Sequence, residues 1–269
     1  MNNVRQQFRA RKAQRVIDGD AAARPLSSGD KASDKSRVKE LAGEIAALQE
    51  VLYAERRHKL LIVLQGMDTS GKDGTVRGVF GEIDPLGITS ISFKQPTADE
   101  KAHDYLWRIH QKVPMQGEVV LFNRSHYEDV LVTRVHDWID DAECKRRYAH
   151  IRDFERMLSE TGTTILKFFL HISSDEQKKR LQQRLDDPDK HWKFDPQDLK
   201  ERAYWKQYQQ QYARAIRHTD TDYAPWYVIP ADSKTQRNLA IASIVLETLR
   251  DMHPAYPPAH PEYMKLEIV

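Results

Sequence analysis

Short apolar runs rich in β-branched and aromatic residues recur along this chain between longer polar and amphipathic stretches. Five such runs predict strands at 60–64, 88–93, 119–122, 165–172 and 226–229. Apolar residues at helical spacing predict helices at 38–54, about 72–83, 98–112, 126–135, 142–161, 174–186, 199–217 and 233–252. Strands that alternate with helices are typical of a parallel sheet with crossover helices, so we expect an α/β fold.

The two ends of the chain differ from this alternating centre. Residues 1–36 are rich in Arg, Ala, Ser, Asp and Gly without a sustained period, so we expect an extended arm lying on the body or on a neighbouring subunit. Residues 37–253 then form a single domain, and residues 254–269 form a C-terminal tail. The arm carries basic residues at Arg5, Arg9, Arg11, Lys12 and Arg15. A nucleic-acid tail is one interpretation, but a solvated or interface arm is favoured, and we expect no nucleic-acid partner.

Composition narrows the class of protein. With 40% hydrophobic residues among 269, the chain can bury one substantial core. Its net charge of +2 is the small difference between 42 basic and 40 acidic residues, so the charge of the whole chain favours no partner. The single cysteine, Cys144, excludes an internal disulfide and fits a reducing compartment. No apolar run approaches the roughly 20 residues of a membrane span and no hydrophobic signal core is present, so we expect a cytoplasmic protein without membrane contact.

A glycine-rich loop directly follows the first predicted strand. Its sequence, GMDTSGKDGT at 66–75, fits the pattern GxxxxGK[ST] except at the last position, where Asp73 replaces the hydroxyl residue that usually binds magnesium. Glycines allow backbone N–H groups to approach a polyphosphate, and Lys72 can reach its terminal phosphates. The predicted phosphate-binding residues of the loop are Gly66, Thr69, Ser70, Gly71, Lys72, Asp73, Gly74 and Thr75. The chain is therefore a candidate phosphoryl-transfer enzyme, with an ordinary glycine turn as the alternative.

A carboxylate, Asp68, lies inside this loop, where it would repel a bound phosphate unless a cation lay between them. Its hard oxygen atoms suit Mg²⁺, so Asp68 is the leading candidate metal ligand. Two other interpretations stay open. Asp68 could orient or deprotonate an attacking oxygen, or it could simply stabilise the turn.

A second polar cluster follows the third predicted strand. Asn123 stands where a Walker B segment would place an aspartate. Arg124 follows it and is well placed to bind phosphate through two parallel hydrogen bonds, with a surface salt bridge to Glu128 as the competing interpretation. Because Asn123 carries no charge, Glu128 and Asp129 are further candidate metal ligands.

Residues 180–202 combine two prolines with dense charge, which indicates a lid that closes over the site. Arg180 and Arg184 lie one helical turn apart, so both can face phosphates when the lid closes, although a solvated helix face has the same spacing. Further predicted phosphate ligands are Arg77, Lys94, Arg134 and Lys193. If such dispersed cations converge near the strand ends, they would line a groove for a long polyanion.

Several sequence blocks occur in one order between about residues 41 and 249. They are GMDTSGKDGT (66–75), FKQPT (93–97), YLWRIH (105–110), FNRSHYEDVL (122–131), HWKF (191–194) and APWYVIP (224–230). In these blocks the chain resembles the second family of polyphosphate kinases, P-loop enzymes related in fold to thymidylate kinase. Many relatives have DRSWY where this chain has NRSHY, so their aspartate cannot be transferred to Asn123. The version RSHYED resembles the subgroup that accepts both AMP and ADP.

The resemblance implies a three-layer α/β/α P-loop kinase fold with a five-stranded parallel sheet and a helical lid. It also implies reversible transfer of the terminal phosphoryl group of inorganic polyphosphate to AMP or ADP, giving ADP or ATP, with GMP and GDP as further acceptors and with Mg²⁺ or Mn²⁺. The residues that match the family's catalytic positions are Asp68, Lys72, Arg124, Arg180 and Arg184. Relatives also suggest a homodimer or homotetramer. The competing hypotheses are an ATP-dependent nucleotide or small-molecule kinase and a nucleic-acid or regulatory binding module.

Overall fold

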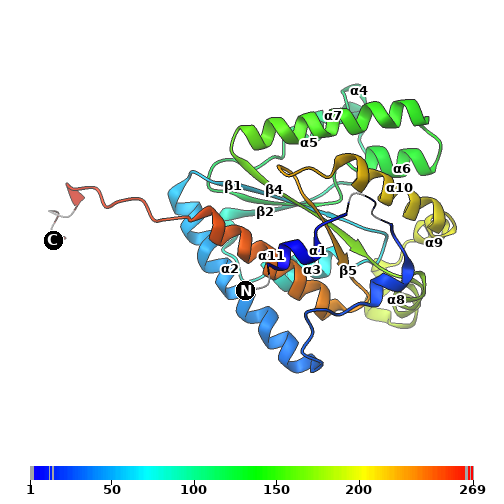
Figure 1. The fold of residues 1–269 in the computed structure, drawn as a ribbon, viewed down its shortest axis with the longest axis horizontal. Coiled ribbons are helices and arrows are strands. Elements are labelled where there is room, and N and C mark those ends of the chain that lie inside the picture. Colours follow the sequence, from blue (N-terminus) through cyan, green and yellow to red (C-terminus); the bar gives the residue numbers. More distant parts are fainter. Residues whose placement is uncertain (1–2, 12, 14, 264–265, 267, 269) are drawn as a thin grey trace.

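A five-stranded parallel sheet runs through the centre of the protein (Figure 1). The computed structural model describes residues 3–11, 13, 15–263, 266 and 268. Its strands are β1 Lys59–Gln65, β2 Ile88–Ser92, β3 Val119–Asn123, β4 Thr163–His171 and β5 Trp226–Pro230. They lie in the order β2-β3-β1-β4-β5, and each neighbouring pair is parallel. The five predicted strands and the α/β fold are confirmed.

Helices cover both faces of this sheet (Figure 1). One face carries α2 Lys31–Glu55, α3 Lys72–Phe80, α11 Lys234–Met252 and the short α1 Val4–Phe8, and the other carries α5 Trp107–His110, α6 Glu128–Val135, α7 Asp141–Glu160 and α10 Trp205–Thr219. Side chains of β1 alternate between the two cores, with Leu60 and Ile62 in the first and Leu61 and Val63 in the second. Because β1 is buried on both sides, its sequence is a continuous apolar run, and the fold has the expected three layers.

The segment between β4 and α10 begins at the carboxyl edge of the sheet. It consists of α8 Ser174–Asp186, a 3₁₀ turn at Pro188–Lys193 and α9 Pro196–Ala203. The remaining short elements are α4 Ala98–Ala102 and 3₁₀ turns at Asp18–Ala22 and Pro85–Gly87. In open α/β sheets, ligands bind at this carboxyl edge, which is also where the glycine loop follows β1. The segment 180–202 is thus near the loop, and its closure stays a prediction.

Three helix predictions are wrong in their extent. The helix expected at 98–112 is divided into α4 and α5, because the side chain of Asp104 accepts two backbone N–H groups and starts a new turn. The helix expected at 199–217 is divided at Tyr204, between α9 and α10. α2 begins before its expected start, because the Asp30 side chain caps it with hydrogen bonds from two backbone N–H groups.

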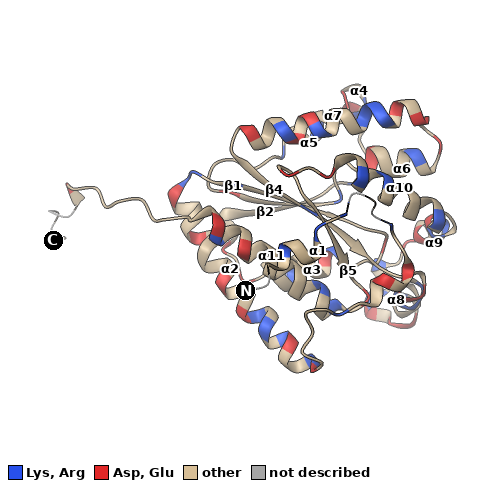
Figure 2. Ribbon diagram, viewed as in Figure 1, with Lys and Arg blue, Asp and Glu red and all other residues tan. Residues whose placement is uncertain are grey.

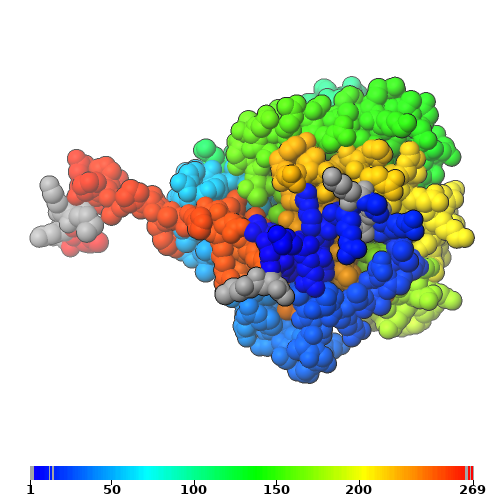
Figure 3. Space-filling model, viewed as in Figure 1, coloured from blue at the N-terminus to red at the C-terminus, as the bar shows by residue number. Residues whose placement is uncertain are grey.

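The N-terminal residues cross the body of the protein on the side of β5 and α11 (Figure 3). Phe8 is buried, and the backbone N–H of Ala10 donates to the carbonyl oxygen of Trp226 at 2.9 Å. Arg9 forms an isolated antiparallel bridge with Tyr227 of β5. Lys12, which belongs to the basic run noted in the sequence, lies outside the described residues.

Asp18 joins this N-terminal segment to both ends of the region between β4 and α10. One carboxylate oxygen accepts the backbone N–H of Ser174 at 3.1 Å, and the other accepts Trp205 Nε1 at 3.2 Å. The carbonyl oxygen of Ile17 also lies 2.7 Å from Nε2 of His171, at the end of β4. Residues 17 and 18 therefore hold the base of the predicted lid.

Positively and negatively charged residues are mixed along the outer helices. Figure 2 shows Lys and Arg mixed with Asp and Glu along α2 and α7, which agrees with the nearly balanced charge of the chain. The residues that follow α11 project away from the body in Figure 1. Within the described ranges, no helix is both long and apolar enough to cross a membrane.

Candidate active site

The loop between β1 and α3 has a shape that requires glycine at two positions. A Cβ atom at Gly66 would lie 2.7 Å from the carbonyl oxygen of Leu170. Gly71 has a φ of +102°, and a Cβ atom there would lie 1.9 Å from Nη1 of Arg237. β4 and α11 therefore pack closely against the loop and fix it at the N-terminus of α3, where backbone N–H groups favour an anion.

Lys72 is the first residue of α3, and its side chain folds back over the loop. Its Nζ donates to the carbonyl oxygens of Gly66 at 2.7 Å and of Met67 at 3.3 Å. Burial, and next the positive charge of Arg124, lowers the pKa of Lys72 to about 8, against the opposing effect of nearby carboxylates. The ammonium group is thus held beside the loop backbone, where a bound phosphate would favour its charged form.

Three hydroxyl groups in and after the loop are buried. The side-chain oxygens of Thr69, Ser70 and Thr75 have no hydrogen-bond partner among the described residues. Buried hydroxyl groups in folded proteins are usually hydrogen-bonded. Together with the N-terminus of α3 and Lys72, these donors give the loop the chemistry of a site for several phosphate groups.

Asp68 and Arg124 form an ion pair beside the loop. Nη2 of Arg124 donates to Oδ1 of Asp68 at 2.6 Å, whereas Nη1 lies 3.9 Å from Oε2 of Glu128. The carboxylate of Glu128, and next that of Asp68, raises the pKa of Arg124, while burial lowers it. The Arg124 side chain is still 41% exposed, so it can contact a ligand while paired. The surface salt bridge with Glu128 is therefore the longer of its two ion pairs.

The two departures from the usual P-loop pattern contact each other. Nδ2 of Asn123, at the end of β3, donates to Oδ1 of Asp73 at 2.5 Å. An aspartate at position 123 would place a second negative charge next to Asp73, whereas the amide provides a donor. The Asn123 side chain thus fixes Asp73 in the first turn of α3.

Arg180 uses all five of its N–H donors inside the protein. Nη1 donates to the carbonyl oxygens of Thr69 at 2.9 Å and Ser70 at 3.2 Å, and Nε donates to Glu176 at 2.9 Å. Nη2 donates to two carbonyl oxygens that follow β5, at 2.8 and 2.7 Å. Arg180 therefore holds the loop backbone from behind, and its predicted contact with phosphate stays a prediction.

Arg184 makes different contacts, although it lies one helical turn further along α8. Its Nη1 donates to the carbonyl oxygen of Lys193 at 2.8 Å and to Oδ2 of Asp198 at 2.9 Å. Burial, and next the charge of Asp68, raises the pKa of Asp198 to about 6, while Arg184 lowers it. Arg184 thus joins α8 to α9 and holds the Asp198 carboxyl group near Asp68.

Comparison with known proteins shows the family to which this chain belongs. A family model described as Polyphosphate kinase 2 (PPK2) matches residues 28–257. The chain belongs to the polyphosphate kinase 2 family. The family resemblance noted in the sequence and the prediction of a kinase are therefore confirmed.

Two curated relatives and one solved structure show how close this polyphosphate kinase 2 chain is to known members. The AMP/ADP-polyphosphate phosphotransferase of Meiothermus ruber is 56% identical over 222 residues, covering 82% of each chain. The ADP-polyphosphate phosphotransferase of Rhodopseudomonas palustris is 41% identical over 233 residues, covering 82% of this chain and 81% of that one. Polyphosphate kinase 2 from Arthrobacter aurescens TC1 superimposes with a TM-score of 0.93 at 45% identity, covering 96% of this chain and 93% of that chain. These relatives do not favour the ATP-dependent alternative.

The candidate metal ligands of this member of the polyphosphate kinase 2 family do not form a complete metal site by themselves. Among the residues that the structure describes, no group of three or more His, Cys, Asp or Glu side chains is arranged to hold a metal ion. Asp129 is partly covered, and burial raises its pKa to about 6, while Arg108 and Arg147 lower it. A metal ion at Asp68 would therefore need further oxygen atoms from the substrate, which is the usual way in which kinases hold Mg²⁺.

The four cations predicted to extend the phosphate site lie in different places. Arg77 lines a pocket on the α2 side of the molecule, and Lys94 is exposed just after β2. Arg134 pairs with Asp137 and Asp141 at the end of α6, and the Lys193 ammonium lies 4.8 Å from the ring centre of Trp192. The structure thus does not gather these four side chains around the loop, and their roles stay predictions.

Two side chains that support the loop were missed in the sequence. Arg237 of α11 is buried, and its Nη1 donates to the carbonyl oxygen of Ser70 at 3.3 Å. Nε2 of Gln177 donates to the carbonyl oxygen of Asp68 at 3.1 Å. Both side chains contact carbonyl oxygens of the loop backbone, and neither residue belongs to a sequence motif that would have pointed to it. Asp198 was also missed, since it is one of many charged residues in its segment.

Proposed function

We propose that this chain transfers the terminal phosphoryl group of inorganic polyphosphate to AMP and ADP, reversibly and with a divalent metal ion. The observation that carries the proposal is the Asp68–Arg124 ion pair at 2.6 Å, next to a glycine loop that holds Lys72. The Meiothermus ruber relative, named an AMP/ADP-polyphosphate phosphotransferase, supports the choice of both acceptors. Polyphosphate has no base or sugar, so a donor site built only from amides, hydroxyls and cations suits it.

In this proposal the loop binds the donor phosphates. Backbone N–H groups at the start of α3 and the hydroxyls of Thr69, Ser70 and Thr75 would surround the phosphate oxygens, with Lys72 neutralising their charge. Arg124 would exchange its contact with Asp68 for one with the transferred group. Because phosphoryl transfer needs little covalent chemistry from the protein, alignment and charge neutralisation account for catalysis.

The residues present fit a bound Mg²⁺ or Mn²⁺ ion. Asp68 offers carboxylate oxygens within the loop, and one or two carboxylates together with substrate phosphates are the usual ligands of Mg²⁺. Glu128, whose carboxylate lies 3.9 Å from Nη1 of Arg124, and Asp129 are the two further candidates. When bound, such an ion neutralises negative charge on the phosphates. Asp68 would thereby serve the metal ion and the acceptor phosphate together.

We further propose that the segment 180–202 closes over the bound substrates as a lid. Arg184 and Asp198 connect its helices, and Arg180 joins α8 to the loop, so movement of α9 would change the surroundings of Asp68. Closure would exclude water and favour transfer to a nucleotide over hydrolysis. The protein would work in the cytoplasm as a homodimer or homotetramer. Light scattering on the purified protein measures its molar mass and so tests the oligomeric state.

Donor choice is the decisive experiment. Purified protein is incubated with polyphosphate, Mg²⁺ and AMP, ADP, GMP or GDP in turn, and the nucleotides are separated by chromatography. We expect AMP to give ADP and ADP to give ATP, at rates that fall when the metal ion is chelated. Absence of product from polyphosphate, together with turnover of ATP and a small alcohol, would overturn the proposal.

A further inference from the structure

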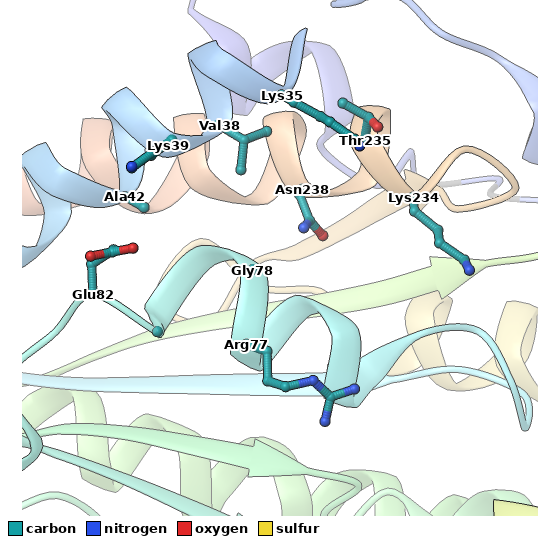
Figure 4. A pocket seen from close by; sticks show the side chains of 11 residues that line it. Lys35, Val38, Lys39, Ala42, Arg77, Gly78, Glu82, Lys234, Thr235 and Asn238 are labelled. Atoms are coloured by element: carbon teal, nitrogen blue, oxygen red, sulfur yellow. The ribbon is translucent and has the colours of Figure 1, made fainter. Parts of the chain in front are cut away.

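A pocket lined by several charged side chains lies on the α2 side of the molecule, between α2, α3 and α11 (Figure 4). Its volume is about 370 Å³. The hydrogen-bond donors around it are the side chains of Lys35, Lys39, Arg77, Lys234, Thr235 and Asn238. Figure 4 shows that they come from all three helices, with Lys39, Arg77 and Lys234 directed to different sides. We call this feature the α2–α11 pocket.

The charges of the α2–α11 pocket are strongly unbalanced. Lys35, Lys39, Arg77 and Lys234 face a single lining carboxylate, that of Glu82. Within the part of the chain that the structure describes, none of these four cations forms an ion pair. Some exposed cations elsewhere on the helices do form ion pairs, such as Arg146 with Glu143. Four unpaired cations around one pocket create a positive potential that attracts a polyanion.

Asn238 adds an amide donor to the floor of the pocket. Its Oδ1 accepts hydrogen bonds from Nε and Nη2 of Arg237 at 3.1 and 3.0 Å. Its Nδ2 therefore lies on the other side, where a Cβ atom at Gly78 would come within 2.3 Å of it. The lack of a side chain at Gly78 keeps this N–H group accessible from α3. The first turn of α11, which has no acidic residue, also contributes its positive helix end.

The α2–α11 pocket shares helix α3 with the glycine loop. Arg77 and Lys72 lie on the same helix, about 7.5 Å apart along its axis. Burial, and next the charges of Arg180 and Arg237, lowers the pKa of Lys234. Both arginines contact the carbonyl oxygen of Ser70. Positively charged side chains therefore lie both behind the loop and at the pocket.

We propose that the α2–α11 pocket binds the distal phosphates of a long polyphosphate chain whose terminal phosphates occupy the glycine loop. This inference rests on the proposed function. A linear polyphosphate presents only negatively charged oxygen atoms, and the pocket offers lysines, an arginine and an amide without a stacked aromatic surface. The pocket would thereby let the enzyme distinguish long donors from short ones.

The double variant K35Q/K39Q tests the proposal with donors of two lengths. For chains of several tens of phosphates we expect the KM to rise about tenfold, and the slope of log KM against log salt to fall by about one to two. For tripolyphosphate, which is too short to leave the loop, KM and kcat should stay unchanged. K145Q/K206Q removes two exposed lysines from α7 and α10 and serves as the matched control. K35R/K39R, which keeps the charge, should retain the KM of the wild type.

Equal effects on long and short donors, or no effect on either, would overturn the proposal. Failure of the proposed function looks different, because the wild-type protein would then transfer phosphate from no polyphosphate at all. Calorimetric titration with long polyphosphate, in the absence of nucleotide, measures the Kd of the donor and therefore tests the pocket even if no phosphate is transferred. An unchanged Kd in K35Q/K39Q would overturn the pocket assignment, and a selective loss of affinity would support it.

Discussion

Individual carboxylates around the loop have partners that differ in kind. Asp73 accepts a neutral amide from Asn123, whereas Asp68 accepts a charged guanidinium from Arg124. The first contact is fixed, since Asn123 is buried at the end of β3. The second is partly exposed, so Arg124 can change partners when a phosphate arrives. The loop therefore contains one aspartate for structure and one that we assign to chemistry.

Replacing Asp68 by asparagine tests that assignment. We expect Asp68→Asn to lower kcat by at least about 100-fold, because the charge that balances Arg124 and offers metal-binding oxygens is lost. The change in Tm should be small, since the amide can still accept a hydrogen bond from Arg124. Asp175→Asn, at an exposed position of α8, is the control for loss of one negative charge. Turnover near that of the wild type in Asp68→Asn would remove this carboxylate from the mechanism.

The pKa of Lys72 predicts a particular pH profile. Its pKa is lowered to about 8, so the ligand-free enzyme loses this positive charge as the pH rises through that value. We expect kcat/KM for polyphosphate, which reports the free enzyme, to fall above pH 8. Bound phosphate favours the charged amine, so kcat at saturating donor should persist to higher pH. A kcat/KM that stays constant up to pH 10 would contradict this assignment of charge.

The motif residues could be predicted from the sequence because their context is local. Gly66, Lys72 and Arg124 each follow a strand whose apolar pattern is unmistakable. Arg237 could not be found in this way, since its hydrogen bond with the carbonyl oxygen of Ser70 connects residues 167 positions apart. Arg180 was found, but the burial of all its donors depends on the packing of α8 against the loop.

At the scale of elements, the strands could be predicted from the sequence more accurately than the helices. A buried parallel strand needs apolar residues on both faces, and that pattern is hard to confuse. Helix ends depend on hydrogen bonds between single side chains and the backbone, such as those of Asp30 and Asp104. These bonds end or divide helices whose apolar spacing continues, which is why the predicted boundaries were wrong there.

Arg184 is one of the side chains that join α8 to α9, together with Arg202, which donates to Ser174 and Gln177. Arg184→Met keeps the bulk of the side chain but removes its donors to Lys193 and Asp198. We expect kcat for transfer to fall about tenfold and the share of free phosphate released by water to rise, because α9 would close less firmly. Both products are measured together in one assay with ADP as acceptor.

Arg146→Met, which removes an exposed arginine of α7, is the control for the loss of a surface guanidinium. An unchanged ratio of hydrolysis to transfer in Arg184→Met would contradict the role of this contact in closure.

At the scale of the whole molecule, the N-terminal segment connects parts that are distant in sequence. It contacts β5, α11 and both ends of the lid segment. The sequence predicted an arm that lies on the body or on a neighbouring subunit, but amino-acid pattern gives no partner for such a segment. Its contacts depend on backbone groups and on one carboxylate, Asp18.

Asp18 is the residue to change in this segment. Asp18→Ala leaves the N–H groups of Ser174 and Trp205 without their acceptor, which costs about 1 kcal/mol and lowers Tm by about 2–4 °C. Asp20→Ala, two residues later and exposed, should leave Tm unchanged. Calorimetry on both variants checks the difference. Equal Tm values would show that Asp18 does not hold the base of the lid.

The bridge between Arg9 and Tyr227 has a consequence for how the protein is made. The N–H of Val4 and its acceptor Glu247 are 243 residues apart, so the ribosome delivers the two groups well separated in time, by about 10–50 s at ordinary elongation rates. During that interval Phe8 has no core to enter. This segment is therefore synthesised long before its partners but is among the last to dock, and completion of the native state must wait until β5 and α11 have left the ribosome.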